Sequence, residues 1–198
     1  MTIWPGSWAT CRFALGRWGV EPDLVSFAKG VTSGYLPLGG VLSSKRVHEA
    51  IESAPADRRF MHAATYSGHP VCCAVGLRNI EIIESEGLVE RAAEMGKRLL
   101  AELEELRDLP SVGDVRGLGM MCGVELVTDR NTKAPALGVG ARLTREALAR
   151  GLVLRVRPGG ANPPVGDTIC LAPPLSTPAE TIERLPEILR AAIIAASG

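Results

Sequence analysis

The feature that most constrains this chain is a lysine placed between a short apolar stretch and a glycine-rich run. Residues 24–28 read Leu-Val-Ser-Phe-Ala, Lys29 follows directly, and glycine occupies positions 30, 34, 39 and 40. A short apolar run bounded by turn signals is typical of a buried strand, and the glycines after it indicate a tight turn. We therefore predict a strand over residues 24–28, a turn, and a second short strand over residues 40–43.

A lysine at the end of a strand, with flexible backbone beyond it, suits an amine that is partly desolvated yet free to move. Burial disfavours the ammonium form and lowers the pKa of a lysine. A neutral lysine amine can form a Schiff base with an aldehyde cofactor such as pyridoxal phosphate (PLP). The other interpretation of Lys29 is an exposed lysine that ends a strand, because most lysines lie at the surface.

Charge and cysteine content narrow the class of protein. The 22 basic and 22 acidic residues cancel, which argues against nucleic acid or an anionic membrane as the main partner. No apolar run is long enough to span a bilayer, and the N-terminus does not have the pattern of a secretory signal. The five cysteines are odd in number and fit neither a metal site nor a disulfide framework, so we expect free thiols in a cytoplasmic protein.

The order of the elements predicts two regions after an atypical N-terminal segment, residues 1–17, that shows no clear periodicity. Residues 18–85 hold the two strands, the lysine turn and a helix that begins at Pro70. Residues 86–198 have the pattern of a small α+β domain with antiparallel strands. Its expected elements are helices over residues 88–106, 139–150 and 177–196 and strands over residues 112–127, 152–156 and 168–172. In the last helix we expect Thr177 to be the N-cap and Pro186 to introduce a kink.

Two further segments carry candidate binding residues. The run Thr65-Tyr66-Ser67-Gly68 offers hydroxyls and backbone N–H groups, a combination that suits a phosphate. The alternative is a hydroxyl-rich loop that leads into a helix. Arg155 and Arg157 lie two positions apart, hence on one face if the strand continues, and an arginine fork can bind a carboxylate through two hydrogen bonds.

Several short motifs occur in one order along residues 18–195, and this ordered set is far more specific than any single motif. They are Glu21-Pro22-Asp23, Ala28-Lys29-Gly30, Gly34-Tyr35-Leu36-Pro37-Leu38-Gly39-Gly40, Thr65-Tyr66-Ser67-Gly68-His69-Pro70, Val115-Arg116-Gly117-Leu118-Gly119, Gly151-Leu152-Val153-Leu154-Arg155 and Ala172-Pro173-Pro174-Leu175. The chain thereby resembles the class III aminotransferases, which are fold-type I PLP-dependent transferases. The resemblance implies an α/β fold, with part of the large PLP-binding domain in residues 18–85 and the small C-terminal α+β domain in residues 86–198.

The resemblance also implies roles for individual residues. Lys29 would hold PLP as a Schiff base and move the α-proton as general acid and base. Thr65 and Tyr66 would bind the cofactor, and Thr65 would reach the phosphate held by a partner subunit, which implies a homodimer. Arg155 matches the arginine that takes the substrate carboxylate in related ω-aminotransferases, with Arg157 as its competitor. The implied reaction is amino transfer between an amine or ω-amino acid and a keto acid.

The chain departs from the family pattern on one side of the lysine. The family places an aspartate that contacts the pyridinium nitrogen shortly before the lysine segment, yet nothing acidic precedes Glu21 here. Without that carboxylate the electron sink of the cofactor weakens. We therefore expect a truncated form of an aminotransferase. Two alternatives stay open: another PLP reaction of the same group (an aminomutase, decarboxylase or epimerase), or a non-catalytic remnant that acts as a dimerisation module.

Overall fold

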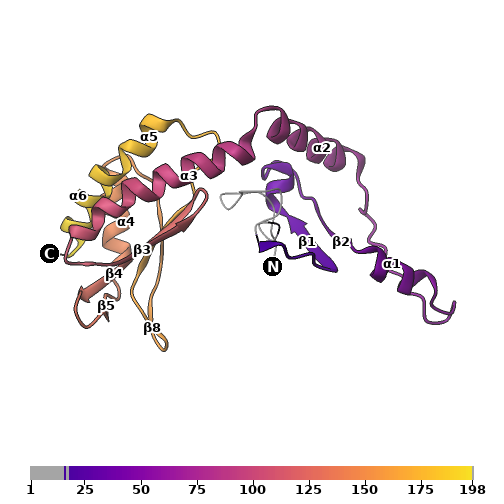
Figure 1. The fold of residues 1–198 in the computed structure, drawn as a ribbon, viewed down its shortest axis with the longest axis horizontal. Coiled ribbons are helices and arrows are strands. Elements are labelled where there is room, and N and C mark those ends of the chain that lie inside the picture. Colours follow the sequence, from indigo (N-terminus) through magenta and orange to yellow (C-terminus); the bar gives the residue numbers. More distant parts are fainter. Residues whose placement is uncertain (1–15, 17, 198) are drawn as a thin grey trace. The chain divides into compact units, whose positions relative to one another are not determined.

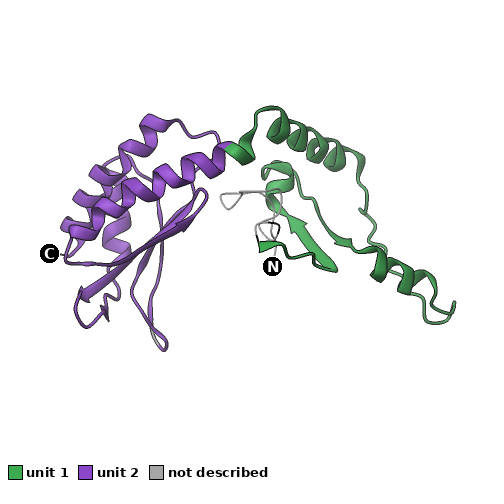
Figure 2. Cartoon of the chain, viewed as in Figure 1, with its two compact units in different colours: residues 1–90 green, residues 91–198 purple. Residues whose placement is uncertain are grey.

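The computed structural model of the chain describes residue 16 and residues 18–197 (Figure 1). It divides into two compact units, residues 1–90 and residues 91–198 (Figure 2). The division falls in the first turn of helix α3 (Leu88–Glu104), close to the boundary predicted at residues 85–86. The atypical segment predicted over residues 1–17 lies outside the described residues, apart from residue 16. Within the described part, no helix has the length and apolar character needed to cross a bilayer.

The first unit is built on a two-stranded antiparallel hairpin that carries the lysine turn. Strand β1 (Leu24–Ala28) pairs with β2 (Gly39–Ser43), from Leu24 opposite Ser43 to Ala28 opposite Gly39. Between the strands lie a short 3-10 helix, η2 (Lys29–Thr32), and the glycine-rich turn. The strand, turn and second strand predicted from the sequence are thus confirmed.

Two helices complete the first unit. Helix α1 (Lys45–Glu52) follows β2, and α2 (Pro70–Ser85) begins at the proline and packs against η2. Proline suits a first helical turn because the missing N–H would have no partner there, and α2 begins at the residue expected from the sequence. Buried apolar side chains are few among the described residues of this unit: Val31, Cys72 and Ile83. The described part of the first unit therefore has only a small core of its own.

The second unit contains the main sheet and core (Figure 1). Four antiparallel strands lie in the order β3-β4-β9-β6, and β5 pairs with the far part of β4. Their bounds are Val112–Leu118 for β3, Met121–Asp129 for β4, Ala134–Pro135 for β5, Arg155–Arg157 for β6 and Thr168–Leu171 for β9. A small hairpin, β7 (Gly160–Ala161) and β8 (Pro164–Val165), follows β6. The helices are α3, a short η3 (Glu105–Asp108), α4 (Gly140–Ala149), α5 (Ala179–Glu183) and α6 (Leu185–Ser197).

The two faces of this sheet differ in chemistry. Alternate residues of β4 (Cys122, Val124 and Leu126) are buried with side chains of α3, α4 and α6 in one core. The opposite face carries Arg116, whose Nη1 lies 2.8 Å from both Asp114 Oδ2 and Glu125 Oε2. The strands expected over residues 112–127 therefore form, with period-two alternation in β4 and a bulge between Val112 and Asp114 in β3. Arg116 lies on the solvent-facing side of the sheet.

Two sequence-based expectations in this unit are wrong. The strand expected over residues 152–156 forms at Arg155–Arg157 instead, because the chain turns at Gly151 (φ +82°) and joins β9 only from Arg155 onward. The helix expected over residues 177–196 is two helices, and the N-cap of the first is Pro178 rather than Thr177. Pro186 lies in the first turn of α6, where its missing N–H leaves no carbonyl unpaired. The proline therefore marks a break between two helices rather than a kink in one.

One buried carboxylate, Asp167, fixes the strand β6 region. Its Oδ1 accepts a hydrogen bond from Gly159 N (2.8 Å) and its Oδ2 accepts one from Gly140 N (2.9 Å), while the residue is only 3% exposed. Gly140 begins α4, and Gly159 lies two positions after the end of β6. The side chain thereby ties the start of one helix to the loop that follows the edge strand.

Replacing Asp167 with asparagine should lower the free energy of unfolding by about 2 kcal/mol, because one oxygen becomes an NH₂ group that faces a buried N–H donor. Urea unfolding measures the loss. Asp129 offers a matched control, since its Oδ1 also accepts two backbone N–H groups (from Asn131 at 2.7 Å and Thr132 at 2.9 Å) but the residue is exposed. Asp129→Asn should change stability much less, because water can replace the lost acceptor. Equal losses in the two variants would contradict the role assigned to burial.

Candidate active site

Lys29 lies where β1 ends and η2 begins, and its backbone conformation was not predicted from the sequence. Its φ is +55°, a left-handed conformation that is uncommon for residues other than glycine. The side chain is exposed, and among the described residues it has no hydrogen bond or ion pair. The expectation that this chain partly desolvates the amine is therefore wrong for the described part, because the two-stranded hairpin places no side chain over it.

The turn after Lys29 is closed by hydrogen bonds within itself. Ser33 N donates to Gly30 O (3.1 Å), and Gly34 N donates to Lys29 O (3.2 Å). The hydroxyl of Thr32, which is buried, donates to Leu36 O (2.6 Å). Ser33 and Gly34 also have positive φ values, +52° and +81°. Gly34 adopts a positive φ without a steric penalty because it has no Cβ atom.

The far end of the hairpin is braced by Asp23 of the Glu21-Pro22-Asp23 motif. Its carboxylate forms an ion pair with Arg46, and its Oδ1 accepts a hydrogen bond from Ser44 Oγ (2.7 Å). The hydrogen bond from Arg46, followed by that from Ser44, holds the pKa of Asp23 below its usual value. This motif residue therefore stabilises the base of the β1–β2 hairpin, at the opposite end from Lys29.

Thr65 and Tyr66 lie in an exposed turn that leads into α2. Ser67 N donates to Ala64 O (2.9 Å), and His69 N donates to Tyr66 O (3.2 Å). The Thr65 hydroxyl has no partner among the described residues. The first N–H groups of α2 lie directly after this turn and have no intrahelical acceptor. Neither Thr65 nor Tyr66 is joined to Lys29 by a hydrogen bond in the described structure.

Arg155 and Arg157 lie in the second unit, on the edge strand β6. Both are exposed, while Val156 between them packs against the core. They lie opposite Cys170 and Thr168 of β9. Neither guanidinium has a hydrogen bond or an ion pair with any residue that the structure describes. Both are therefore available to an anionic ligand, and the geometry of the strand does not choose between them.

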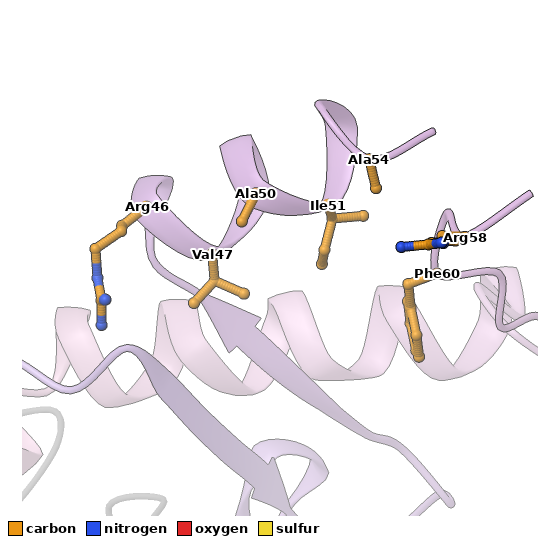
Figure 3. Close-up of a pocket in the computed structure, with 7 residues that line it drawn as sticks. All are labelled: Arg46, Val47, Ala50, Ile51, Ala54, Arg58 and Phe60. Atoms are coloured by element: carbon orange, nitrogen blue, oxygen red, sulfur yellow. The ribbon is translucent and has the colours of Figure 1, made fainter. Parts of the chain in front are cut away.

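A pocket of about 350 Å³ lies elsewhere in the first unit, between α1 and the segment after it (Figure 3). Val47, Ala50 and Ile51 of α1 line its middle, with Arg46 at one end and Arg58 and Phe60 at the other. None of the predicted site residues lines it. The pocket therefore does not correspond to the site predicted from the sequence.

The residues present fit part of what PLP requires. Within residues 18–197, Lys29 supplies an exposed amine without a partner, and the Thr65 turn supplies an unpaired hydroxyl and backbone N–H groups suited to a phosphate. The acidic partner of the pyridinium nitrogen has no counterpart before Glu21. Lys29 and the Thr65 turn therefore fit the aldehyde and the phosphate of PLP by their chemistry, and the residues before Glu21 offer no carboxylate for its ring nitrogen.

Two residues that support the site were missed by the sequence reasoning. Thr32 closes the lysine turn, and Asn79 of α2 donates hydrogen bonds to the backbone of that turn. A signal for Asn79 was available, because glycine and asparagine are both poor helix formers, yet Gly76 and Asn79 lie one turn apart inside α2. Two such residues on one helix face indicate a close contact with another segment.

The comparisons with known proteins establish the family. The family model described as "Aminotransferase class-III" matches residues 6–193. The adenosylmethionine-8-amino-7-oxononanoate aminotransferase of Nitratidesulfovibrio vulgaris is 40% identical over 187 residues, which cover 92% of this chain and 33% of that enzyme. The taurine–pyruvate aminotransferase of Rhodobacter capsulatus is 36% identical over 195 residues, covering 95% of this chain and 41% of that enzyme. The chain belongs to the class III aminotransferase family, whose members are PLP-dependent, and spans about two fifths or less of these relatives.

Solved structures agree with this assignment and with a fold-type I architecture. An (S)-enantioselective ω-transaminase from Thermomicrobium roseum matches with a TM-score of 0.86 and 42% identity, over 96% of this chain and 41% of that one. An amine transaminase from an uncultivated Pseudomonas species, solved in a PLP-bound form, matches with a TM-score of 0.85 and 36% identity, over 96% of this chain and 42% of that one. The α/β fold implied by the motifs is thereby confirmed.

Proposed function

We propose that this chain takes part in PLP-dependent amino transfer between an amine or ω-amino acid and a keto acid, with Lys29 as the cofactor-binding lysine. The observation that carries the proposal is the position of Lys29: its side chain, exposed and without a partner among the described residues, follows β1 on a left-handed backbone, within motifs that match the family in order. The relatives support this substrate class, since they include taurine–pyruvate, putrescine–pyruvate and diaminobutyrate–2-oxoglutarate aminotransferases. The particular donor and acceptor differ among them.

The proposed roles follow from what each side chain can do. When bound, PLP would supply an electron sink for electron density released at the substrate α-carbon. The amine of Lys29 would accept the proton from that α-carbon and later return it. The Thr65 hydroxyl and the N–H groups of its turn, together with Tyr66, would hold the phosphate. Arg155 would orient the substrate through its carboxylate, with Arg157 as the competing residue.

We further propose that the protein acts as a homodimer in the cytoplasm, with residues 18–85 as part of the large PLP-binding domain and residues 86–198 as the small domain. The exposure of Phe60, Met61 and Tyr66 in the segment before α2 supports contact with a second subunit. The four cysteines in the described part are free thiols, which supports a reducing compartment. In such a dimer the Thr65 turn would serve the cofactor of the partner subunit.

A second candidate function is a non-catalytic dimerisation module of the same fold. The exposure of Lys29 in the described structure favours it. Incubation with PLP, reduction with borohydride and mapping of the modified residue by mass spectrometry separate the two. A selective label on Lys29 supports the enzyme, whereas label scattered over exposed lysines supports the module.

Arg155 and Arg157 can be distinguished by paired alanine variants in a transaminase assay. Arg155→Ala should raise the KM for the keto acid about 10- to 100-fold, because a charge-assisted hydrogen bond to the carboxylate is lost. Arg157→Ala should leave that KM within about threefold, since one cation replaced at the surface has a small effect. The KM for an amine without a carboxylate should stay unchanged in both variants. A larger effect from Arg157→Ala would reverse the assignment.

A further inference from the structure

The carboxamide of Asn79 joins the middle of α2 to the lysine turn. Its Nδ2 donates one hydrogen bond to Gly30 O (2.9 Å) and a second to Val31 O (3.1 Å). Gly30 directly follows Lys29, and Asn79 is half-buried against this turn. A single side chain that is distant in sequence thus binds two consecutive carbonyl groups next to the candidate catalytic lysine.

The turn needs such a tie because its backbone is unfavourable by itself. Lys29 and Ser33 both have left-handed φ values, +55° and +52°, although neither is glycine. Residues in this region persist where the surrounding structure over-determines their conformation. Within the turn, Lys29 O and Gly30 O accept hydrogen bonds from backbone N–H groups of the turn itself. Asn79 adds side-chain hydrogen bonds from a different segment, helix α2.

The face of α2 that carries Asn79 is shaped to approach the turn closely. Gly76, one helical turn earlier, is buried, and a Cβ atom there would lie 2.8 Å from Leu38 Cδ2. Val31 of the turn is buried as well and lies 3.8 Å from the same position. The missing side chain at Gly76 lets the helix come near enough for the short asparagine side chain to reach both carbonyls.

We propose that Asn79 is a positioning residue for Lys29. Its amide fixes the backbone that carries the lysine side chain. This inference rests on the role proposed above for Lys29. The planar amide supplies two N–H donors, so one side chain can satisfy two adjacent carbonyl oxygens. An aspartate of the same shape has no donor at neutral pH and would set a negative charge against both oxygens.

Hydrogen exchange of the full chain tests the proposal without the cofactor. In Asn79→Asp the amides of Ser33 and Gly34 should exchange about tenfold faster than in the wild type, because the turn loses both external hydrogen bonds. The matched control is Ile83→Val, which trims a buried side chain one turn further along α2 and leaves the amide in place. Unchanged exchange in Asn79→Asp, or an equal increase in Ile83→Val, would overturn the proposal.

A second readout links the turn to the amine itself. After treatment with PLP and borohydride, the label on Lys29 is measured relative to that on Lys97, an exposed lysine of α3. Asn79→Asp should lower the Lys29 share about tenfold, and Ile83→Val should preserve it; an unaltered share in Asn79→Asp would contradict positioning. If the wild type itself takes no selective label, the function proposed for Lys29 fails, and the exchange of Ser33 and Gly34 still decides whether Asn79 holds the turn.

Discussion

The Lys29→Arg variant loses the borohydride-stable PLP adduct that the wild-type chain is expected to form. Arginine keeps the positive charge and a similar length, but its guanidinium stays protonated at any accessible pH and cannot attack an aldehyde. The label on peptides that contain position 29 should therefore fall to background. Mass spectrometry after reduction measures this directly, and transaminase activity should fall with it.

Two variants show that such a loss reflects chemistry rather than unfolding. Lys45→Arg changes another exposed lysine of the first unit, one that pairs with Glu49 at 3.5 Å, and should retain the label at Lys29. Lys29→Gly should also lose the adduct without loss of folding, because glycine adopts a φ of +55° at no steric cost. A full adduct in Lys29→Arg, mapped to a different lysine, would refute the assignment.

The sequence predicted the backbone elements around Lys29 well where the signal is local. The strand before Lys29, the glycine-rich turn and the start of α2 at Pro70 each depend on residues within a few positions, and all form as expected. The left-handed φ of Lys29 was not predictable in this way, because Asn79 comes from a segment some fifty residues away. The same holds for Asp167, whose side chain joins two N–H groups that no local pattern connects to it.

The exposure of Lys29 illustrates a second limit of local patterns. A strand followed by a glycine-rich turn specifies where the lysine emerges, but desolvation depends on whichever side chains cover it. In the described residues the hairpin of β1 and β2 has no further strand on either side. Partial burial of the amine was inferred from the turn alone and is wrong for the part of the chain that the structure describes, although the turn itself is correct.

Replacing Gly96 with alanine should lower the free energy of unfolding of the second unit by about 3 kcal/mol, although the change adds only one methyl group. Gly96 lies in α3, and an ideal Cβ there would sit 2.3 Å from the carbonyl carbon and oxygen of Gly119. Gly119 belongs to the tight turn between β3 and β4 and has a φ of +55°. Because the clash is with backbone in a turn, neither a rotamer change nor a small shift of a flexible side chain can relieve it.

Helix propensity makes the sign of the change in unfolding free energy informative. Alanine is a better helix former than glycine by about 1 kcal/mol, so in the absence of the close contact Gly96→Ala would stabilise α3. Urea unfolding of the variant measures the balance. Glu94→Ala, two positions earlier on an exposed part of the same helix, should change the free energy of unfolding by less than about 0.5 kcal/mol. Stabilisation in Gly96→Ala would show that α3 can move away from the β3–β4 turn, and that the packing of Gly96 on Gly119 does not set the position of this helix on the sheet.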